Sequence, residues 1–253
     1  MQREHDGVLA AVARAFAQRS IVIIGAAALR WHYPVFRGTL DLDLCIAIDL
    51  EEHTQARGLP EGWVRQAGMP HRWRMSDGQL LDILPAADGL LRAGRVVWPD
   101  GIVMDLAGID LAMRDHLRYS DKLPANVVVA SRRALFVTKV VAWLDRPSER
   151  QKDLGDLAML LDDYVDLEDP RRFDTTIPDG LDWSERPAFL LGRDLHAICA
   201  EHHRLKIREF VRRVTAPDSR DRHWLLQAAP SWREDERAMP GRIGALLVGL
   251  EES

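Results

Sequence analysis

The sequence predicts an α+β fold in which a small mixed sheet with helices is followed by a mainly helical part. Runs typical of strands are confined to about the first half of the chain, such as IVIIG (21–25) and the alternating TLDLDLCIAI (39–48). In the second half, apolar residues recur at helical spacing, as at Leu154, Leu157 and Leu161. The chain has 253 residues, 47% of them hydrophobic and 29% charged, which predicts one or two domains with a core that can hold a cleft.

The composition argues against several classes of protein. A formal net charge of −5 argues against a surface that coats nucleic acid throughout, although a local basic groove stays open. Cys45 and Cys199 are the only cysteines and lie far apart, which predicts neither a disulfide framework nor a paired-cysteine zinc motif. The start of the chain lacks a secretory apolar region, and no apolar run approaches the roughly 20 residues that span a bilayer. We therefore expect a cytoplasmic protein without a membrane partner.

Local patterns predict the elements of the first part. Their order is a helix at 5–18, a strand at 21–25, a helix at 26–33, a strand at 39–48 and two strands at 71–75 and 79–84 joined by a turn at 76–78, with short mixed elements after them. The helix at 26–33 ends before Pro34, because the residue before a proline disfavours the α conformation.

The second part begins after the strand-like VVVA (127–130). Ser131 is predicted to cap the first of the helices that fill the rest of the chain. The predicted domains are a sheet-containing lobe at 1–125 and a helical lobe at 126–253.

Two aspartates lie two residues apart on the strand predicted at 39–48. Side chains at this spacing leave the same face of a strand, so Asp41 and Asp43 are expected side by side. Neighbouring carboxylates repel each other unless a cation lies between them, and Mg²⁺ commonly bridges carboxylates to substrate phosphates. Asp82 lies in the apolar strand LLDIL, where an aspartate is costly without a partner. On a neighbouring strand it would complete a cluster for two metal ions, one activating an attacking hydroxyl and the other neutralising a triphosphate.

The spacing alone leaves a second interpretation open, because two aspartates on an edge strand are often only solvated side chains. The preceding glycine favours the metal site. Gly25 lies between a buried strand and a helix, where a glycine lets phosphate oxygens approach backbone N–H groups and the positive end of the helix. The order of the elements is specific: a strand, a glycine, a helix, a strand with D-x-D, and then a lone buried aspartate.

This order resembles the nucleotidyltransferase superfamily, of the polymerase-β-like fold, whose signature is a hydrophobic strand, Gly-Gly or Gly-Ser, a short spacer and Asp-x-Asp. Here the signature reads Gly25-Ala26 and then Asp41-Leu42-Asp43, with Asp82 in the place of the third carboxylate. The segment FRGTLDLD (36–43) is closer still to the R-x-T-x-D-x-D version of the AbiEii-like abortive-infection toxins. Ala26 departs from the signature, because it keeps the backbone donor but lacks a serine hydroxyl.

The second lobe agrees with the same family. Its segment at 131–161 has a helical lysine followed by an arginine and then by K-D-x-x-D, at positions Lys139, Arg146, Lys152, Asp153 and Asp156. The resemblance covers about residues 20–165.

The resemblance implies an enzyme that transfers a nucleoside monophosphate from a nucleoside triphosphate to an acceptor and releases pyrophosphate. It implies two Mg²⁺ ions, with Mn²⁺ as an alternative, on Asp41, Asp43 and Asp82, of which Asp82 is also a candidate general base. The residues it assigns to nucleotide binding are Gly25, Ala26, Arg37, Thr39, Lys139, Arg146 and Asp156. It further implies the toxin of a toxin–antitoxin or phage-defence system, with RNA such as tRNA or protein as acceptor and a cognate antitoxin as partner.

The helical lobe gives an independent argument for a phosphate site. Lys139 and Arg146 are two helical turns apart and are expected to share a face, where they could grip a triphosphate. A solvated basic face is the alternative. Asp153 and Asp156 could orient these cations or serve only as ion-pair partners, which we expect for Asp153.

Two rival functions remain at this stage. One is a drug- or small-molecule-modifying nucleotidyltransferase of the same superfamily. The other is a nucleotide-binding partner module without turnover, against which the three intact carboxylates argue.

Two weaker patterns lie in the second lobe. The helically spaced His196, Cys199, His202 and His203 are poor evidence for zinc without a second cysteine pair. The basic stretch HHRLKIREFVRR (202–213) could contact RNA, but it is more typical of a solvated helix face.

Overall fold

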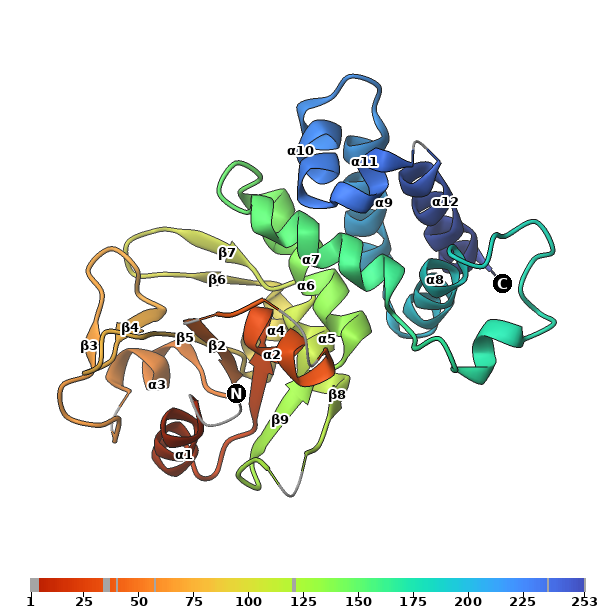
Figure 1. The fold of residues 1–253 in the computed structure, drawn as a ribbon. Coiled ribbons are helices and arrows are strands. Elements are labelled where there is room, and N and C mark those ends of the chain that lie inside the picture. Colours follow the sequence, from red (N-terminus) through yellow and green to blue (C-terminus); the bar gives the residue numbers. More distant parts are fainter. Residues whose placement is uncertain are drawn as a thin grey trace. The chain divides into compact units, whose positions relative to one another are not determined.

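The computed structural model describes residues 5–33, 37–39, 41–56, 58–119, 122–235 and 237–252. Pro34, Phe36 and Leu40 of the motif region lie outside these residues. Contacts divide the chain into two compact units, Met1–Leu135 and Phe136–Ser253 (Figure 1). The expected boundary at 125/126 falls before this division.

The first unit is a mixed sheet with helices. Its helices are α1 (Asp6–Ala15), α2 (Gly25–His32), α3 (Leu50–Gln55), α4 (Asp88–Ala93), α5 (Ile109–Arg114) and the start of α6 (Arg132–Asp145). Its strands are β1 (Ile21–Ile24), β2 (Asp41–Ile46), β3 (Val64–Arg65), β4 (Arg72–Arg74), β5 (Leu80–Pro85), β6 (Arg95–Val97), β7 (Val103–Asp105), β8 (His116–Leu117) and β9 (Val127–Ala130).

Seven of these strands form one sheet in the order β3-β4-β5-β2-β1-β9-β8, and β6 and β7 form a separate hairpin. In the centre, β2 pairs with β1 in antiparallel and with β5 in parallel orientation. The sheet is therefore mixed, as the sequence predicts. The apolar residues that alternate with the aspartates of β2 and β5, Leu42, Leu44, Leu81 and Ile83, are at most 1% exposed and fix these two strands in the core.

The hairpin of β4 and β5 turns where the sequence places it. The Met75 N–H donates to the carbonyl of Gln79 at 2.9 Å, which closes a three-residue turn. Gly78 has a φ of +86°, a value that favours glycine in this turn. With Met75 opposite Gln79, antiparallel pairing puts Arg72 opposite Asp82.

Ser131 caps α6 as predicted, since its hydroxyl accepts a hydrogen bond from the Ala134 N–H at 3.1 Å. β9 pairs in parallel with β1, so the strand that the sequence assigns to the second lobe belongs to the sheet. This pairing explains why the compact first unit extends beyond residue 125.

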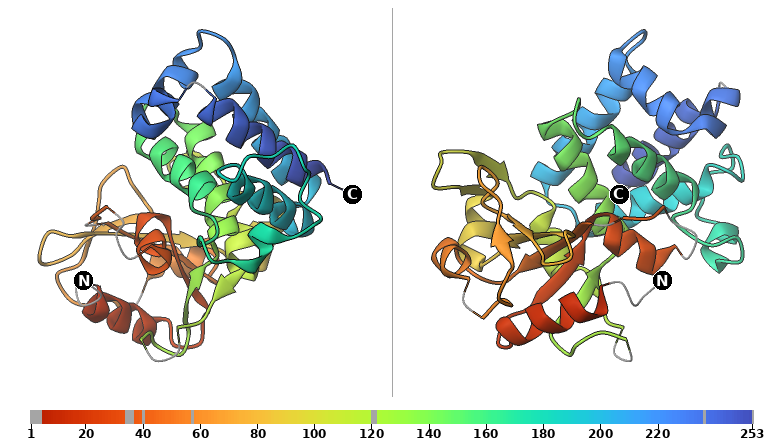
Figure 2. Two further views of the ribbon diagram at one scale, coloured as in Figure 1. Left: turned by 45° about the vertical axis from the view of Figure 1, so that its right-hand side comes forward. Right: turned by 60° about the vertical axis from the view of Figure 1, so that its left-hand side comes forward.

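The second unit is helical. Its elements after α6 are α7 (Gln151–Asp162), a 3₁₀ turn (Pro170–Phe173), α8 (Arg186–Ile198), α9 (Glu201–Thr215), α10 (Arg220–Ala228), α11 (Pro230–Glu234) and α12 (Ala238–Glu251). α12 lies along α8 (Figures 1 and 2). The two helices meet closely at Gly192 and Gly249, where an added Cβ would lie 2.1 Å from a carbonyl oxygen of the other helix. None of the helices in the described residues has the length and apolar character needed to cross a bilayer.

Candidate active site

The predicted carboxylates lie in one row of side chains across the sheet. Asp43 is the register partner of Ile24 on β1 and of Asp82 on β5. Asp82 in turn faces Arg72 on β4. Residues paired in this way project from the same face, and Asp41 shares that face because it lies two residues before Asp43. The sheet thus brings all three predicted carboxylates to one face of two neighbouring strands.

The three aspartates differ in burial. Asp41 and Asp43 are half-buried, whereas Asp82 is only 7% exposed. Cys45 follows on the same face and is fully buried. Burial and the charge of Asp43 raise the pKa of its thiol. Asp41, Asp43 and Asp82 offer oxygen ligands, which suit divalent cations such as Mg²⁺ or Mn²⁺.

Gly25 lies directly against Asp43. A Cβ added to this glycine would lie 2.2 Å from Oδ2 of Asp43 and 3.0 Å from its Cγ. Gly25 also has a φ of +65°, which a side chain rarely adopts. The glycine motif and the D-x-D motif are separate in sequence but contact each other through Gly25 and Asp43.

The helix that begins at Gly25 presents its first N–H groups at this contact. The residue before it, Ile24, offers no side-chain cap. These donors, with the positive end of the helix, suit an anionic ligand such as a phosphate. Ala26, the next residue of the motif, is 8% exposed and contributes its backbone N–H to the same turn.

Replacing Gly25 by alanine should destabilise the first unit by about 2–4 kcal/mol, from about 1–2 kcal/mol of backbone strain and the displacement of Asp43. The matched control is Gly94→Ala, because Gly94 has a φ of +66° but open space around its Cβ position. Urea denaturation of both variants measures the difference. A cost for Gly25→Ala no larger than that for Gly94→Ala would contradict the close contact with Asp43.

Arg72 is a neighbour of the carboxylate row that the sequence interpretation did not single out. Its Nε and Nη2 donate to Oδ1 and Oδ2 of Asp82, both at 2.7 Å. The hydrogen bonds to Asp82 raise the pKa of Arg72, and the charges of Asp41 and Asp43 raise it further against the effect of burial. The predicted turn at 76–78 was enough to place Arg72 next to Asp82, because a three-residue turn fixes these two residues opposite each other in the hairpin.

The oxygens of Asp41, Asp43 and Asp82 do not all lie within 4.8 Å of one another in the described structure. Asp82 points its two oxygens at Arg72 instead. The residue types and the shared face fit a pair of divalent cations.

Two further predicted residues lie just before β2. The Thr39 hydroxyl lies 3.3 Å from the N–H of Asp41 and 3.2 Å from its carbonyl, so it supports the start of the D-x-D segment. Arg37 is exposed. The assignment of Arg37 and Thr39 to nucleotide binding stays a prediction.

In the second unit, Lys139 is buried between two carboxylates. Its Nζ lies 2.8 Å from Oδ1 of Asp153 and 2.6 Å from Oδ2 of Asp156. Burial alone would lower the pKa of Lys139, but the charges and hydrogen bonds of the two aspartates outweigh it and the pKa is raised. Both Asp153 and Asp156 are thus ion-pair partners of this lysine.

Arg146 does not share the environment of Lys139, contrary to the expected common face. α6 ends at Asp145, and Arg146 lies beyond it with 44% of its side chain exposed. It pairs with Asp145 and Glu149 at 3.2 and 3.5 Å. The physical reason is Pro147, which disfavours the α conformation at the residue before it.

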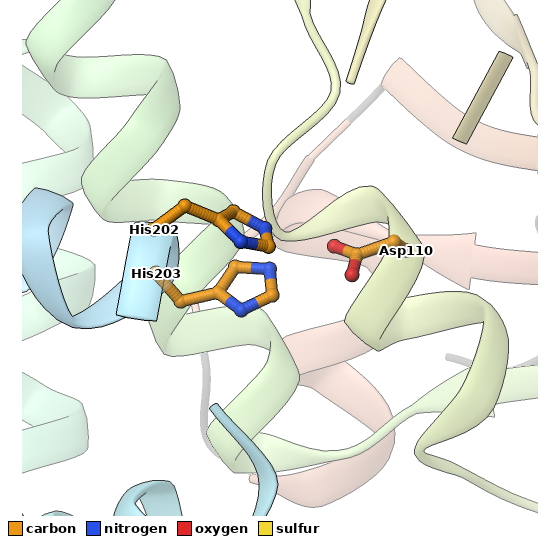
Figure 3. Close-up of side chains that lie close together, drawn as sticks. All are labelled: Asp110, His202 and His203. Carbon is orange, nitrogen blue, oxygen red and sulfur yellow. The ribbon is translucent and has the colours of Figure 1, made fainter. Parts of the chain in front are cut away.

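The histidines and the basic stretch of α9 have structural partners. Nδ1 of His196 lies 2.9 Å from the carbonyl of Leu250, and Nδ1 of His203 accepts from the Ala200 N–H at 3.1 Å. The rings of His202 and His203 lie side by side with centroids 3.8 Å apart (Figure 3, which also draws Asp110 of the first unit). Three of the four arginines of α9 form ion pairs, namely Arg208 with Glu201 and Glu251, Arg212 with Glu209, and Arg213 with Asp221, and Arg204 donates to the carbonyls of His196 and Cys199. A solvated, internally neutralised helix face accounts for this stretch.

Comparison with known proteins identifies the family. The model of the nucleotidyl transferase AbiEii toxin family, type IV toxin–antitoxin system, matches residues 7–237. Neither the curated proteins nor the solved structures give a significant match. The match extends through nearly all of the chain, well beyond the residues 20–165 on which the resemblance rested, and includes both the carboxylate row and the Lys139 cluster. The chain belongs to the AbiEii family of toxin nucleotidyltransferases.

Proposed function

We propose that this enzyme transfers a nucleoside monophosphate from a nucleoside triphosphate to a hydroxyl of RNA, such as tRNA, or of a protein, as the toxin of a toxin–antitoxin system with a cognate antitoxin. The acceptor oxygen forms a bond to the α-phosphorus, the bond from that phosphorus to the β-phosphate oxygen breaks, and pyrophosphate leaves. The hydroxyl proton passes to a carboxylate of the row, for which the family resemblance names Asp82.

One observation supports this reaction above the others. Three carboxylates share one face of two adjacent strands, and the positive end of α2 begins at Gly25 beside them. The first feature suits divalent cations and the second suits phosphate oxygens. A nucleoside triphosphate with its cations offers both ligands.

The residues divide the work by chemical type. Asp41, Asp43 and Asp82 would hold two Mg²⁺ ions, or Mn²⁺, and these ions would polarise the acceptor hydroxyl and offset the charge of the triphosphate. The backbone N–H groups at Gly25 and Ala26 would orient phosphate oxygens by hydrogen bonds. Thr39 would keep the start of β2 in place. For Lys139, Asp156 and Arg146, nucleotide binding rests on the family resemblance, and Arg37 on the R-x-T-x-D-x-D motif.

The reaction can be tested with purified protein, each α-labelled nucleoside triphosphate and a lysate fraction, with and without Mg²⁺. Label that becomes acid-precipitable and sensitive to ribonuclease identifies RNA as the acceptor, and sensitivity to protease identifies protein. Label confined to a small molecule supports a small-molecule-modifying enzyme instead. Nucleotide binding without any transfer or pyrophosphate release, under all these conditions, would contradict the proposal.

Metal and nucleotide should strengthen each other's binding. Three carboxylates without phosphate ligands should hold Mg²⁺ weakly, whereas Mg²⁺ bound jointly by carboxylates and phosphates is favoured. Coupling of about 1–3 kcal/mol is expected, and it makes the rise in melting temperature with both ligands larger than the sum of the separate rises. Thermal shift measurements on wild type and Asp41→Asn test this. Additive shifts in wild type, or unchanged synergy in the variant, would remove Asp41 from the site.

A further inference from the structure

A guanidinium faces the carboxylate row, and the reaction above gives it no role. Arg72 and Asp82 form a two-pronged pair in which one donor meets each oxygen of the carboxylate. The side chains are 24% and 10% exposed, so the pair is largely shielded from water. A planar, two-pronged pair of this kind fixes orientation as well as charge.

Arg72 contributes a positive charge to the row. Asp41, Asp43 and Asp82 present three carboxylates on one face, and strand register places Arg72 opposite Asp82, within reach of the charges of the other two. The neighbouring arginine of β4, Arg74, is exposed and faces Leu80 in the register. Among the described residues Arg74 forms no ion pair with the row. The two arginines on one strand thus differ in whether they neutralise it.

We propose that Arg72 is a positioning residue that orients Asp82 and serves as the counter-charge of the row, so that a divalent cation binds there against its positive charge. This inference rests on the proposed metal-dependent function. It explains why both oxygens of Asp82 accept hydrogen bonds from Arg72 on β4. Arg72 would stabilise the metal-free protein and make cation binding depend more strongly on the phosphates of the nucleotide.

Two substitutions separate charge from orientation. Arg72→Gln removes the positive charge, so Mg²⁺ should bind more tightly by on the order of tenfold, a coupling typical of interacting sites. Arg72→Lys keeps the charge but loses the planar fork. The Arg72→Lys variant should show a Mg²⁺ titration midpoint near that of wild type. It should lower kcat more than it raises KM for the nucleotide. Arg74→Gln is the matched control and should leave the Mg²⁺ midpoint unchanged.

The experiment is a Mg²⁺ titration of each variant, followed by melting temperature, with and without a non-hydrolysable nucleoside triphosphate analogue. A tighter midpoint in Arg72→Gln but not in Arg72→Lys or Arg74→Gln supports the proposal. Equal midpoints in wild type and Arg72→Gln, or the same shift in Arg74→Gln, would overturn it. If wild type shows no Mg²⁺ response with or without the analogue, the proposed function fails, and the role of Arg72 is then decided without metal.

The role of Arg72 without metal is tested by a double-mutant cycle of melting temperatures, measured in the presence of a metal chelator. The cycle uses Arg72→Gln, Asp82→Asn and the double variant. Arg72→Gln should lower the melting temperature by about 5 °C or more in the wild-type background, since it leaves Asp82 buried without its partner. In the Asp82→Asn background it should have little effect. Equal losses in both backgrounds would show that Arg72 does not act through Asp82.

Discussion

Replacing Asp43 by asparagine should lower the rate of nucleotide transfer by about 10³-fold or more, equivalent to at least ~4 kcal/mol of transition-state stabilisation. Asp43 is the central member of the row, between Gly25 on one side and Asp82 on the other. Its amide replacement keeps the shape of the side chain but removes one anionic oxygen donor. Steady-state kinetics with the labelled nucleotide measure the loss.

The fold should survive this change. Asp43 is half-buried beside two other carboxylates, so removing its charge relieves repulsion in the metal-free protein, and the melting temperature should be unchanged or higher. The matched control is Asp88→Asn, which removes the same charge from an exposed position at the start of α4. Wild-type transfer by Asp43→Asn, or an equal loss in Asp88→Asn, would show that the carboxylate row is not the catalytic site.

The core of the site could be predicted because each part has a strong local pattern. A buried strand that runs into Gly25, the period-2 alternation of β2 and an aspartate inside an apolar strand each carry their own physical reason. The parallel pairing of β2 with β5 is a long-range property of the sheet, and only the hypothesis that Asp41, Asp43 and Asp82 share metals connected them. The register confirms that they share one face.

The contact between Gly25 and Asp43 and the pair of Arg72 with Asp82 were not predicted, for different reasons. The first depends on the exact approach of β2 to the turn after β1, which no local pattern specifies. The second was within reach, because a three-residue turn fixes the hairpin register. Helical spacing misled in the case of Arg146, since it assumes that the helix continues, and α6 ends one residue earlier.

Lys139 is expected to stabilise the fold as well as to bind nucleotide, because its buried environment predicts a large effect on stability whatever its contact with the nucleotide. The lysine is 5% exposed, and its removal takes away the cation that lies between two buried carboxylates, Asp153 and Asp156. Breaking a buried ion pair by removing one partner costs about 3–5 kcal/mol. The raised pKa of Lys139 means that its stabilisation is fully present below its ordinary value of 10.5 and is lost only as the pH rises through the raised value. At neutral pH the stabilisation by Lys139 is therefore fully present and does not change with pH.

Lys139→Ala should accordingly lower the free energy of unfolding of the second unit by about 3–5 kcal/mol at neutral pH, whereas Lys152→Ala, an exposed position on α7, should change it by less than about 0.5 kcal/mol. Urea denaturation measures both. The triple variant Lys139→Met, Asp153→Asn and Asp156→Asn removes all three charges and should recover much of the loss, because the cost lies in two carboxylates buried without the lysine. Nucleotide titration and transfer by the variants, at a temperature where each stays folded, then test the family role of Lys139. Its variants should bind nucleotide or turn over more weakly than Lys152→Ala. Equal stability of the two alanine variants would contradict the buried ion cluster, and equal nucleotide binding and turnover in folded protein would remove Lys139 from the proposed nucleotide site.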